Sequence, residues 1–166
     1  MGIAPGDVAV DIGAGTGFWT LPLSQLVGPA GMVYAVDVEP IMHEELGTLV
    51  REKQLSNVQV VPSSEQEIPL SNAVADVAIA GFVVHEPADH AAFVHEIVRL
   101  LRPGGRLLVV DGQKKPSEKG PLLEHRLAQR DVEAMLSNAG LKVERLDAPN
   151  ADVYVLLGRR AVADGA

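Results

Sequence analysis

The feature that most constrains this chain is a glycine-rich segment, Asp11–Gly17 (DIGAGTG), between two stretches of different periodicity. The segment continues the apolar run Val8–Ile12, and the amphipathic stretch Phe18–Leu26 follows it. Glycines at a junction between a strand and a helix permit a tight turn and let a ligand approach the backbone closely. The first N–H groups of the helix are free to bind a polar or anionic ligand. The segment therefore predicts a ligand site at the end of a strand.

A second acid specifies the kind of ligand. Asp37 lies near the end of the apolar run Met32–Val38, 20 residues beyond Gly17. A carboxylate at this place can accept hydrogen bonds from both hydroxyls of a ribose, so we expect an adenosine-containing ligand. The dinucleotide fingerprint G-x-G-x-x-G would require a third glycine where Phe18 stands. We expect this bulky side chain to obstruct close packing of the helix on the strand, which disfavours NAD.

Apolar runs alternate with amphipathic stretches along the whole chain, which is typical of βαβ units and a mainly parallel sheet. One helix is expected to begin at Pro40, and Pro103-Gly104-Gly105 is expected to end a later one before the fifth strand. The expected strands are Val8–Ile12, Met32–Val38, Val58–Val61, Val74–Gly81, Arg106–Asp111, Leu141–Leu146 and Val153–Leu157.

The 166 residues suit a single domain, which we place at residues 1–158, with a flexible tail at 159–166. The net charge of −8 disfavours nucleic acid and anionic membranes as partners. No apolar run reaches the roughly 20 residues of a membrane span. The N-terminal residues lack the pattern of a signal peptide, so a cytoplasmic location is expected. The sequence leaves the oligomeric state open, and a homodimer is compatible with it.

Four segments, in order along the chain, resemble motifs of the class I S-adenosylmethionine-dependent methyltransferases, in the branch near the ubiquinone and menaquinone pathway enzymes. The segments are Val8–Gly17 (VAVDIGAGTG), Val33–Asp37 (VYAVD), Asp76–His85 (DVAIAGFVVH) and Leu100–Val109 (LLRPGGRLLV). The fold expected from pattern and resemblance together is α/β. It is a Rossmann-like, doubly wound, seven-stranded and mostly parallel sheet with one antiparallel strand near the C-terminus.

The resemblance also implies which residues bind S-adenosylmethionine. Asp37 would hold the ribose, while Val38 and Met42 would flank the adenine. Ser64 stands where many relatives carry an acid that meets the adenine amine, and Glu65 follows it. The residues implied around the methionine moiety are Asp11, Gly13, Ala14, Gly15, Thr16 and Gly17.

The catalytic candidates are His85 and Glu86, in the loop after the fourth expected strand. A base is needed only where the methyl acceptor must lose a proton, and histidine titrates near neutral pH. The alternative is that both side chains hydrogen-bond within their loop or cap the next helix. No metal site is expected, because the histidines lack the spacing of metal ligands.

The function predicted from these residues is transfer of a methyl group from S-adenosylmethionine to a small-molecule acceptor by in-line displacement. Two alternatives stay open: an NAD(P)-dependent oxidoreductase, and a non-catalytic module that binds an adenosyl cofactor or a partner. Family members usually carry a helix of roughly 20 residues before the first strand. This chain begins almost at the strand, which predicts either a shortened protein or an open cofactor site.

Overall fold

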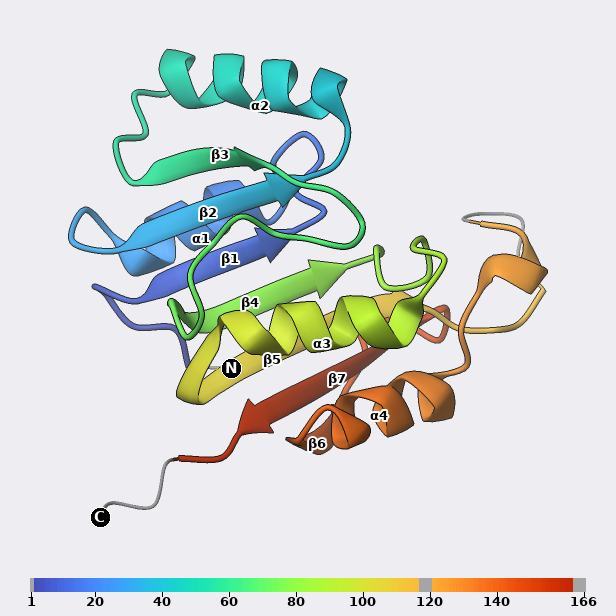
Figure 1. Ribbon diagram of the computed structural model, residues 1–166. Coiled ribbons are helices and arrows are strands. Elements are labelled where there is room, and N and C mark those ends of the chain that lie inside the picture. Colours follow the sequence, from blue (N-terminus) through green and yellow to red (C-terminus); the bar gives the residue numbers. More distant parts are fainter. Residues whose placement is uncertain (1, 117–120, 163–166) are drawn as a thin grey trace.

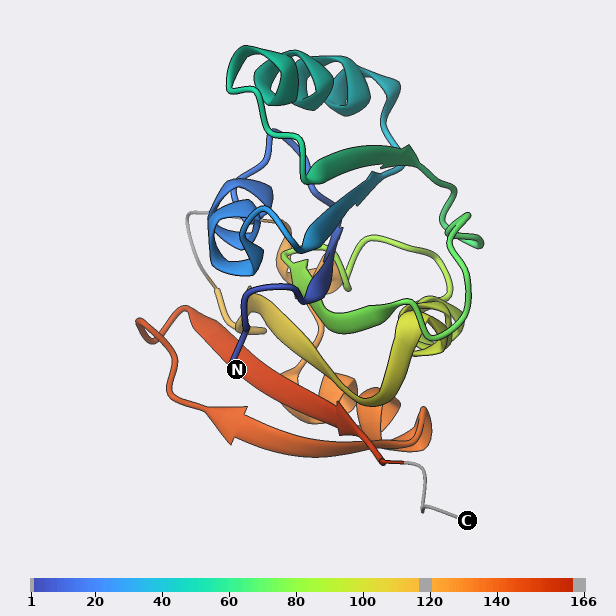
Figure 2. The same cartoon turned by 90° about the vertical axis from the view of Figure 1, so that its left-hand side faces the viewer.

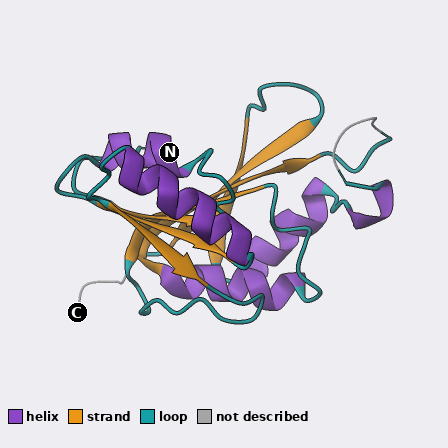
Figure 3. Ribbon diagram, turned by 90° about the horizontal axis from the view of Figure 1, so that it is seen from above, coloured by secondary structure: helices purple, strands orange, loops and turns teal. Residues whose placement is uncertain are grey.

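A computed structural model of the chain describes residues 2–116 and 121–162. A seven-stranded sheet lies at its centre, with helices on both faces (Figure 1, Figure 3). The strand order is β3-β2-β1-β4-β5-β7-β6, and β7 runs antiparallel to both of its neighbours, β5 and β6. The strands are β1 (Val8–Ile12), β2 (Met32–Asp37), β3 (Val58–Pro62), β4 (Ala75–Gly81), β5 (Leu101–Gly112), β6 (Leu141–Leu146) and β7 (Val153–Arg160).

Four α-helices flank the sheet in two layers. Leu23 of α1 and Leu46 of α2 pack on the face that carries Ala9 and Ala35, whereas α3 and α4 cover the opposite face. Figure 2 shows α2 at the end of the sheet that carries β3. The helices are α1 (Thr20–Val27), α2 (Pro40–Glu52), α3 (His90–Leu100) and α4 (Gln129–Asn138), with the short 3₁₀ turn η1 (Leu123–His125) before α4.

The strand order opens a crevice beside β1. The chain proceeds outward from β1 to β2 and β3 on one side, then returns to β4 on the other side of β1. The loops that leave β1 and β4 therefore diverge, and in open parallel sheets ligands bind at such a switch point. Ala9 and Val10 in β1 are both fully buried, as expected for a central strand covered on both faces.

All seven predicted strands are present, and the predicted direction of one C-terminal strand is confirmed by β7. The predicted first residue of β5, Arg106, was wrong, because the strand begins at Leu101. Leu101 already pairs with Ala75, immediately after the last residue of α3. The Pro103-Gly104-Gly105 turn falls inside β5, where the register shifts between Ala75 and Val77, so it makes an irregularity in the strand instead of a loop before it.

Two further boundaries differ from the sequence interpretation by more than one residue. Helix α1 begins at Thr20 instead of Phe18, because the turn of the glycine loop extends through Trp19. Strand β7 continues to Arg160, where its backbone still pairs with Leu141 of β6, so the first two residues of the predicted tail belong to the sheet. Residues 163–166 of that predicted tail lie outside the described residues. None of the described helices is long and apolar enough to cross a membrane.

Candidate functional site

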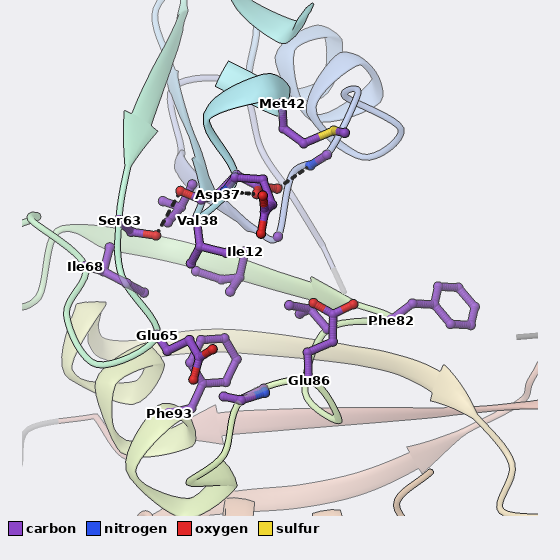
Figure 4. Close-up of a pocket in the computed structure, with 16 residues that line it drawn as sticks. Ile12, Asp37, Val38, Met42, Ser63, Glu65, Ile68, Phe82, Glu86 and Phe93 are labelled. Carbon is purple, nitrogen blue, oxygen red and sulfur yellow. Dashed lines mark hydrogen bonds between the residues drawn. The ribbon is translucent and has the colours of Figure 1, made fainter. Parts of the chain in front are cut away.

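A cavity of about 350 Å³ lies at the carboxyl ends of β1, β2 and β4. Its walls come from the glycine loop, the start of α2, the segment after β3, the loop after β4 and one side of α3 (Figure 4). Apolar side chains such as Ile12, Val83 and Phe93 form much of this surface. The charged side chains that line it are all carboxylates: Asp37, Glu39, Glu65 and Glu86. The cavity therefore suits a ligand with an apolar part and hydrogen-bond donors or positive charge.

The glycine loop forms one wall of the cavity through Gly13 and Gly15, which have φ angles of +68° and +50°. A Cβ atom on Gly13 would lie only 2.7 Å from a methyl group of Val83, so a side chain does not fit there. A Cβ atom on Gly15 would meet nothing within 4 Å. The loop thus packs tightly against the loop after β4 at Gly13 and leaves open space at Gly15.

Asp37 ends β2 and joins this loop to the start of α2. One carboxylate oxygen accepts a hydrogen bond from the backbone N–H of Gly15 at 2.7 Å, and the other accepts from that of Glu39 at 3.0 Å. The side chain is buried yet lines the cavity. Each oxygen retains acceptor capacity, because a carboxylate offers about four lone-pair sites. The position suits an acceptor of ligand hydroxyl groups.

Asp11 lies beneath the glycine loop and does not line the cavity. It is fully buried, and one oxygen accepts a hydrogen bond from the hydroxyl of Thr20 at 2.6 Å. The other oxygen has no hydrogen-bond partner within the described part of the chain. Burial raises the pKa of the Asp11 carboxyl to about 6. Asp11 therefore ties the loop to the start of α1 and keeps one unsatisfied acceptor under the site.

The segment after β3 places alternate side chains on the cavity. Ser63 and Glu65 line it, whereas Ser64 points away, and its hydroxyl oxygen accepts hydrogen bonds from the backbone of Gln66 and Glu67. Of the two residues predicted near the adenine, Glu65 therefore lines the cavity and Ser64 does not. Successive side chains of an extended chain point to opposite sides, so the parity of the strand end decides which serine faces the cavity.

The loop after β4 forms the facing wall. Phe82 has a φ angle of +58°, in the left-handed region that side chains rarely adopt, and it lies at the outer edge of the cavity (Figure 4). Glu86 projects into the cavity from this wall, and Asp37 faces it from the other side (Figure 4). Desolvation raises the pKa of Glu86. No described residue makes a hydrogen bond with the carboxylate of Glu86.

His85 points away from the cavity, toward the carboxyl end of β5. Its Nδ1 lies 2.9 Å from both carboxylate oxygens of Asp111, and the two side chains are only 8% and 4% exposed. A carboxylate can only accept, so Nδ1 carries the proton and donates it. This hydrogen bond raises the pKa of His85. Asp111 was not among the predicted residues, because it looks like the last residue of an ordinary buried strand.

The predicted site residues thus fall into two groups. Those that line the cavity are Gly13, Gly15, Asp37, Val38, Met42, Glu65 and Glu86. Those that do not are Asp11, Ala14, Thr16, Gly17, Ser64 and His85. The cavity also uses residues that the sequence interpretation missed, including Ser63, Phe82 and Phe93. Phe93 has the helical spacing of a core residue, and nothing in the sequence marks its second role.

Phe18 does not obstruct packing of the helix on the strand, so the reason expected from the sequence for disfavouring a dinucleotide was wrong. The Phe18 side chain is 76% exposed and does not pack between helix and strand. The close approach occurs one residue later, where Trp19 covers Gly81 at the end of β4 so tightly that a Cβ on Gly81 would lie 2.2 Å from the indole nitrogen. Within residues 2–116 and 121–162, no group of three or more metal-ligating side chains gathers.

Comparison with known proteins identifies the family. The profile of the methyltransferase domain family matches residues 10–109. The demethylmenaquinone methyltransferase of Geobacillus sp. (strain WCH70) is 31% identical over 111 residues, which are 67% of this chain and 47% of that protein. Its counterpart from Staphylococcus aureus (strain JH9) is 34% identical over 113 residues, which are 67% of this chain and 45% of that protein. The chain spans about half the length of these curated relatives.

A solved structure agrees over nearly the whole chain. The crystal structure of a SAM dependent methyltransferase from Aquifex aeolicus is 31% identical, with a TM-score of 0.89, and covers 95% of this chain and 84% of that one. The segment that matches the family, residues 10–109, contains the glycine loop, Asp37 and the loop after β4, which form part of the cavity described above. The chain therefore belongs to the methyltransferase domain family, among the class I S-adenosylmethionine-dependent methyltransferases.

Proposed function

We propose that this chain transfers a methyl group from S-adenosylmethionine to a small-molecule acceptor. The observation that carries the proposal is the hydrogen bond from the Gly15 N–H to the Asp37 carboxylate. It brings this carboxylate next to a glycine with open space around it, at the edge of a cavity of about 350 Å³. An adenosyl group requires both features: a partner for two neighbouring hydroxyls and a backbone without a side chain in the way.

The residues present fit this cofactor. The space at Gly15 is what a bound ligand would fill, since a Cβ there meets nothing within 4 Å. Asp37 would accept the ribose hydroxyls, and Val38 and Met42 would lie against the adenine ring. Ser63 or Glu65, from the segment after β3, would meet the adenine amine in place of Ser64.

Asp11 and the loop from Gly13 to Gly17 would surround the methionine part. Asp11 would act from beneath the loop, through the backbone that it orients, because its side chain does not line the cavity. When bound, the cofactor supplies a methyl group on a positively charged sulfur, and the transfer disperses that charge. The chain's contribution is to align the acceptor and to exclude water with apolar walls such as Val83 and Phe93.

The acceptor would enter beside Phe82 and Glu86, on the wall opposite Asp37. All charged groups that line the cavity are carboxylates, so a neutral or cationic acceptor is favoured over an anionic one. This charge also argues for a small molecule and against nucleic acid as the acceptor. The carboxylate of Glu86, which has no hydrogen-bond partner among the described residues, would accept a hydrogen bond from the acceptor.

Calorimetric titration with S-adenosylhomocysteine tests the cofactor, with NADH and NADPH as parallel controls. We expect saturable binding of S-adenosylhomocysteine alone. Binding of a nicotinamide cofactor instead, or of none of the three, would overturn the proposal. Binding of S-adenosylhomocysteine without transfer of a radiolabelled methyl group to any acceptor in a broad small-molecule screen would favour the non-catalytic binding module.

A further inference from the structure

Polar groups at the carboxyl ends of β4 and β5 and at the amino end of β7 form a second cluster beside the cavity. His85 and Asp111 make a buried pair, and Tyr154 is directly opposite Asp111 in the pairing of β5 with β7. The Tyr154 hydroxyl is buried and has no hydrogen-bond partner among the residues that the structure describes, and burial raises its pKa. Such a concentration of buried polar groups costs stability unless it is fully paired, so it calls for an explanation beyond packing.

We infer that His85 and Asp111 form one proton-accepting unit, in which Asp111 positions the imidazole and His85 removes a proton from the methyl acceptor through Nε2. The inference rests on the proposed methyl transfer. It also narrows the acceptor to a molecule whose reacting atom carries an ionisable proton, such as a phenol, a hydroquinone or an amine.

The geometry around His85 supports this role. Both carboxylate oxygens of Asp111 accept the hydrogen bond from Nδ1–H, each at an N···O distance of 2.9 Å. This contact fixes the orientation of the ring and leaves the lone pair on Nε2. No described residue makes a hydrogen bond with Nε2. Asp111 is itself fixed, because one oxygen also accepts from the backbone N–H of Gly112 at 2.7 Å. An aspartate that orients a histidine in this way favours the tautomer needed in a general base.

His85 is also close to the cavity along the chain. Val83 and Glu86, on either side of it, both line the cavity, and the backbone N–H of Glu86 donates to the carbonyl of Val83 to close the turn between them. The His85 side chain itself does not line the cavity. In the inferred step, a proton from an acceptor in the cavity therefore reaches Nε2 through an intervening water molecule.

The charged groups around His85 act in opposite directions. Asp111 from β5 and Glu86 from the same loop raise its pKa, and Arg126, which precedes α4, lowers it. His90 of α3 makes its hydrogen bond through Nε2 to the His85 carbonyl oxygen, at 3.4 Å. Arg126 also binds the carbonyl oxygens of Gln113 and Lys115, so it holds the segment after β5 beside the pair. The balance makes His85 a stronger base than an isolated imidazole.

The chemical step balances without a further reactant. The acceptor's lone pair forms the new bond to the methyl carbon while the carbon–sulfur bond breaks and leaves its electrons on sulfur. The proton of the acceptor's O–H or N–H moves to Nε2, and the imidazolium is stabilised by the Asp111 carboxylate. Solvent removes this proton after product release.

The test uses the full chain and its His85→Gln and Asp111→Asn variants, with His95→Gln as the matched control on the exposed side of α3. The probes are catechol, a short-chain hydroquinone and a primary amine, with dimethyl sulfide as an acceptor that has no proton to lose. We expect methylation of at least one proton-bearing probe. We expect His85→Gln to lower that rate by roughly 10²–10⁴, and His95→Gln to leave it unchanged.

The Asp111→Asn variant distinguishes a positioning role of Asp111 from a merely structural one, because only a positioning role predicts a changed pH dependence of the rate. An amide can still accept the Nδ1 hydrogen bond, but its lack of charge lowers the pKa of His85. The rate should fall at least about tenfold, and the pH of half-maximal rate should shift downward, in parallel with the His85 imidazole signal followed by NMR. S-adenosylhomocysteine affinity and thermal unfolding identify any variant whose site or fold is damaged.

Three results would overturn the inference while leaving methyl transfer intact: methylation of dimethyl sulfide only, a wild-type rate in His85→Gln, or an unchanged pH profile in Asp111→Asn. A wild-type chain that fails to bind S-adenosylhomocysteine would instead refute the proposed function itself.

Discussion

The carboxylate of Asp37 accepts a hydrogen bond from the backbone N–H of Gly15 at 2.7 Å, across 22 positions of sequence. This contact joins the end of β2 to the turn after β1, and it orients the carboxylate at the edge of the cavity. The second oxygen bonds the N–H of Glu39 at the start of α2. The acid predicted to hold a ribose therefore also stabilises the loop on which the rest of the cofactor would lie.

Replacing Asp37 should weaken cofactor binding more than it weakens the fold. Asp37→Ala removes the proposed ribose acceptor, and hydrogen bonds to a charged group contribute about 1.5–3 kcal/mol. We expect S-adenosylhomocysteine affinity to fall at least about tenfold by calorimetry. Asp37→Asn, which can still accept from Gly15, should have an intermediate affinity.

Glu45→Ala on the exposed side of α2 is the control and should bind like the wild type. Equal affinity in Asp37→Ala and Glu45→Ala would exclude the ribose role of Asp37.

A methyl group at Gly15 should block the cavity at a modest cost in stability. Gly15 and Gly140 both have positive φ angles, +50° and +89°, and a Cβ atom at either would meet nothing within 4 Å. Alanine at each should therefore lower the free energy of unfolding by about 1–2 kcal/mol through backbone strain alone. Only Gly15→Ala should also reduce S-adenosylhomocysteine affinity, because Gly140 lies at the end of α4.

Urea unfolding and calorimetry separate the two effects. Unchanged binding by Gly15→Ala would mean that the ligand does not approach the loop at this glycine.

Asp11 should make the protein less stable as the pH rises from 4 to 7. Its pKa is about 6 in the folded protein, against an ordinary value of 3.8, so the folded state binds the proton more tightly than the unfolded state. Its contribution is fully present below pH 3.8 and is lost as the pH rises through 6. The difference of roughly two pKa units corresponds to about 3 kcal/mol.

Asp11→Asn is neutral throughout, so the free energy of unfolding of this variant should rise relative to the wild type between pH 4 and 7. Urea unfolding at several pH values measures this, with Asp147→Asn on the exposed surface as the control. Parallel pH curves for the wild type and Asp11→Asn would show that Asp11 is already ionised in the folded state near pH 5.

Asp89 should stabilise α3 without taking part in binding. Its carboxylate accepts a hydrogen bond from the backbone N–H of Ala92 at 2.9 Å, which is a helix N-cap contact. Asp89→Ala should lower the free energy of unfolding by about 1 kcal/mol, whereas Asp89→Ser should retain most of it. Because Asp89 does not line the cavity, S-adenosylhomocysteine affinity should stay unchanged. Loss of affinity in Asp89→Ala would indicate that the start of α3 holds the loop after β4 in its binding shape.

The sequence alone predicted those elements and residues whose signal lies in a short stretch of chain. Strand β1, its glycine loop and Asp37 were all predicted, because a buried central strand is a continuous apolar run and the loop needs residues without side chains. The bounds of β1 and β6 were predicted to the residue. The boundaries of α1 and β5 were not, because both depend on tertiary contacts that no local pattern records. The turn before α1 packs Trp19 on Gly81 of β4, and the irregularity near Gly104 arises in the pairing of β5 with β4.

The tertiary structure decided which side chains meet. Ser63 faces the cavity in place of Ser64 because the pairing of β3 with β2 sets the parity of the strand end, where Ser63 bonds the carbonyl of Asp37. His85 and Asp111 are 26 positions apart and become a pair only because β4 and β5 lie side by side with their carboxyl ends at the same edge. Residue type fixes what a side chain can do, but its partner is fixed by strand order and register, which arise from the packing of the whole sheet.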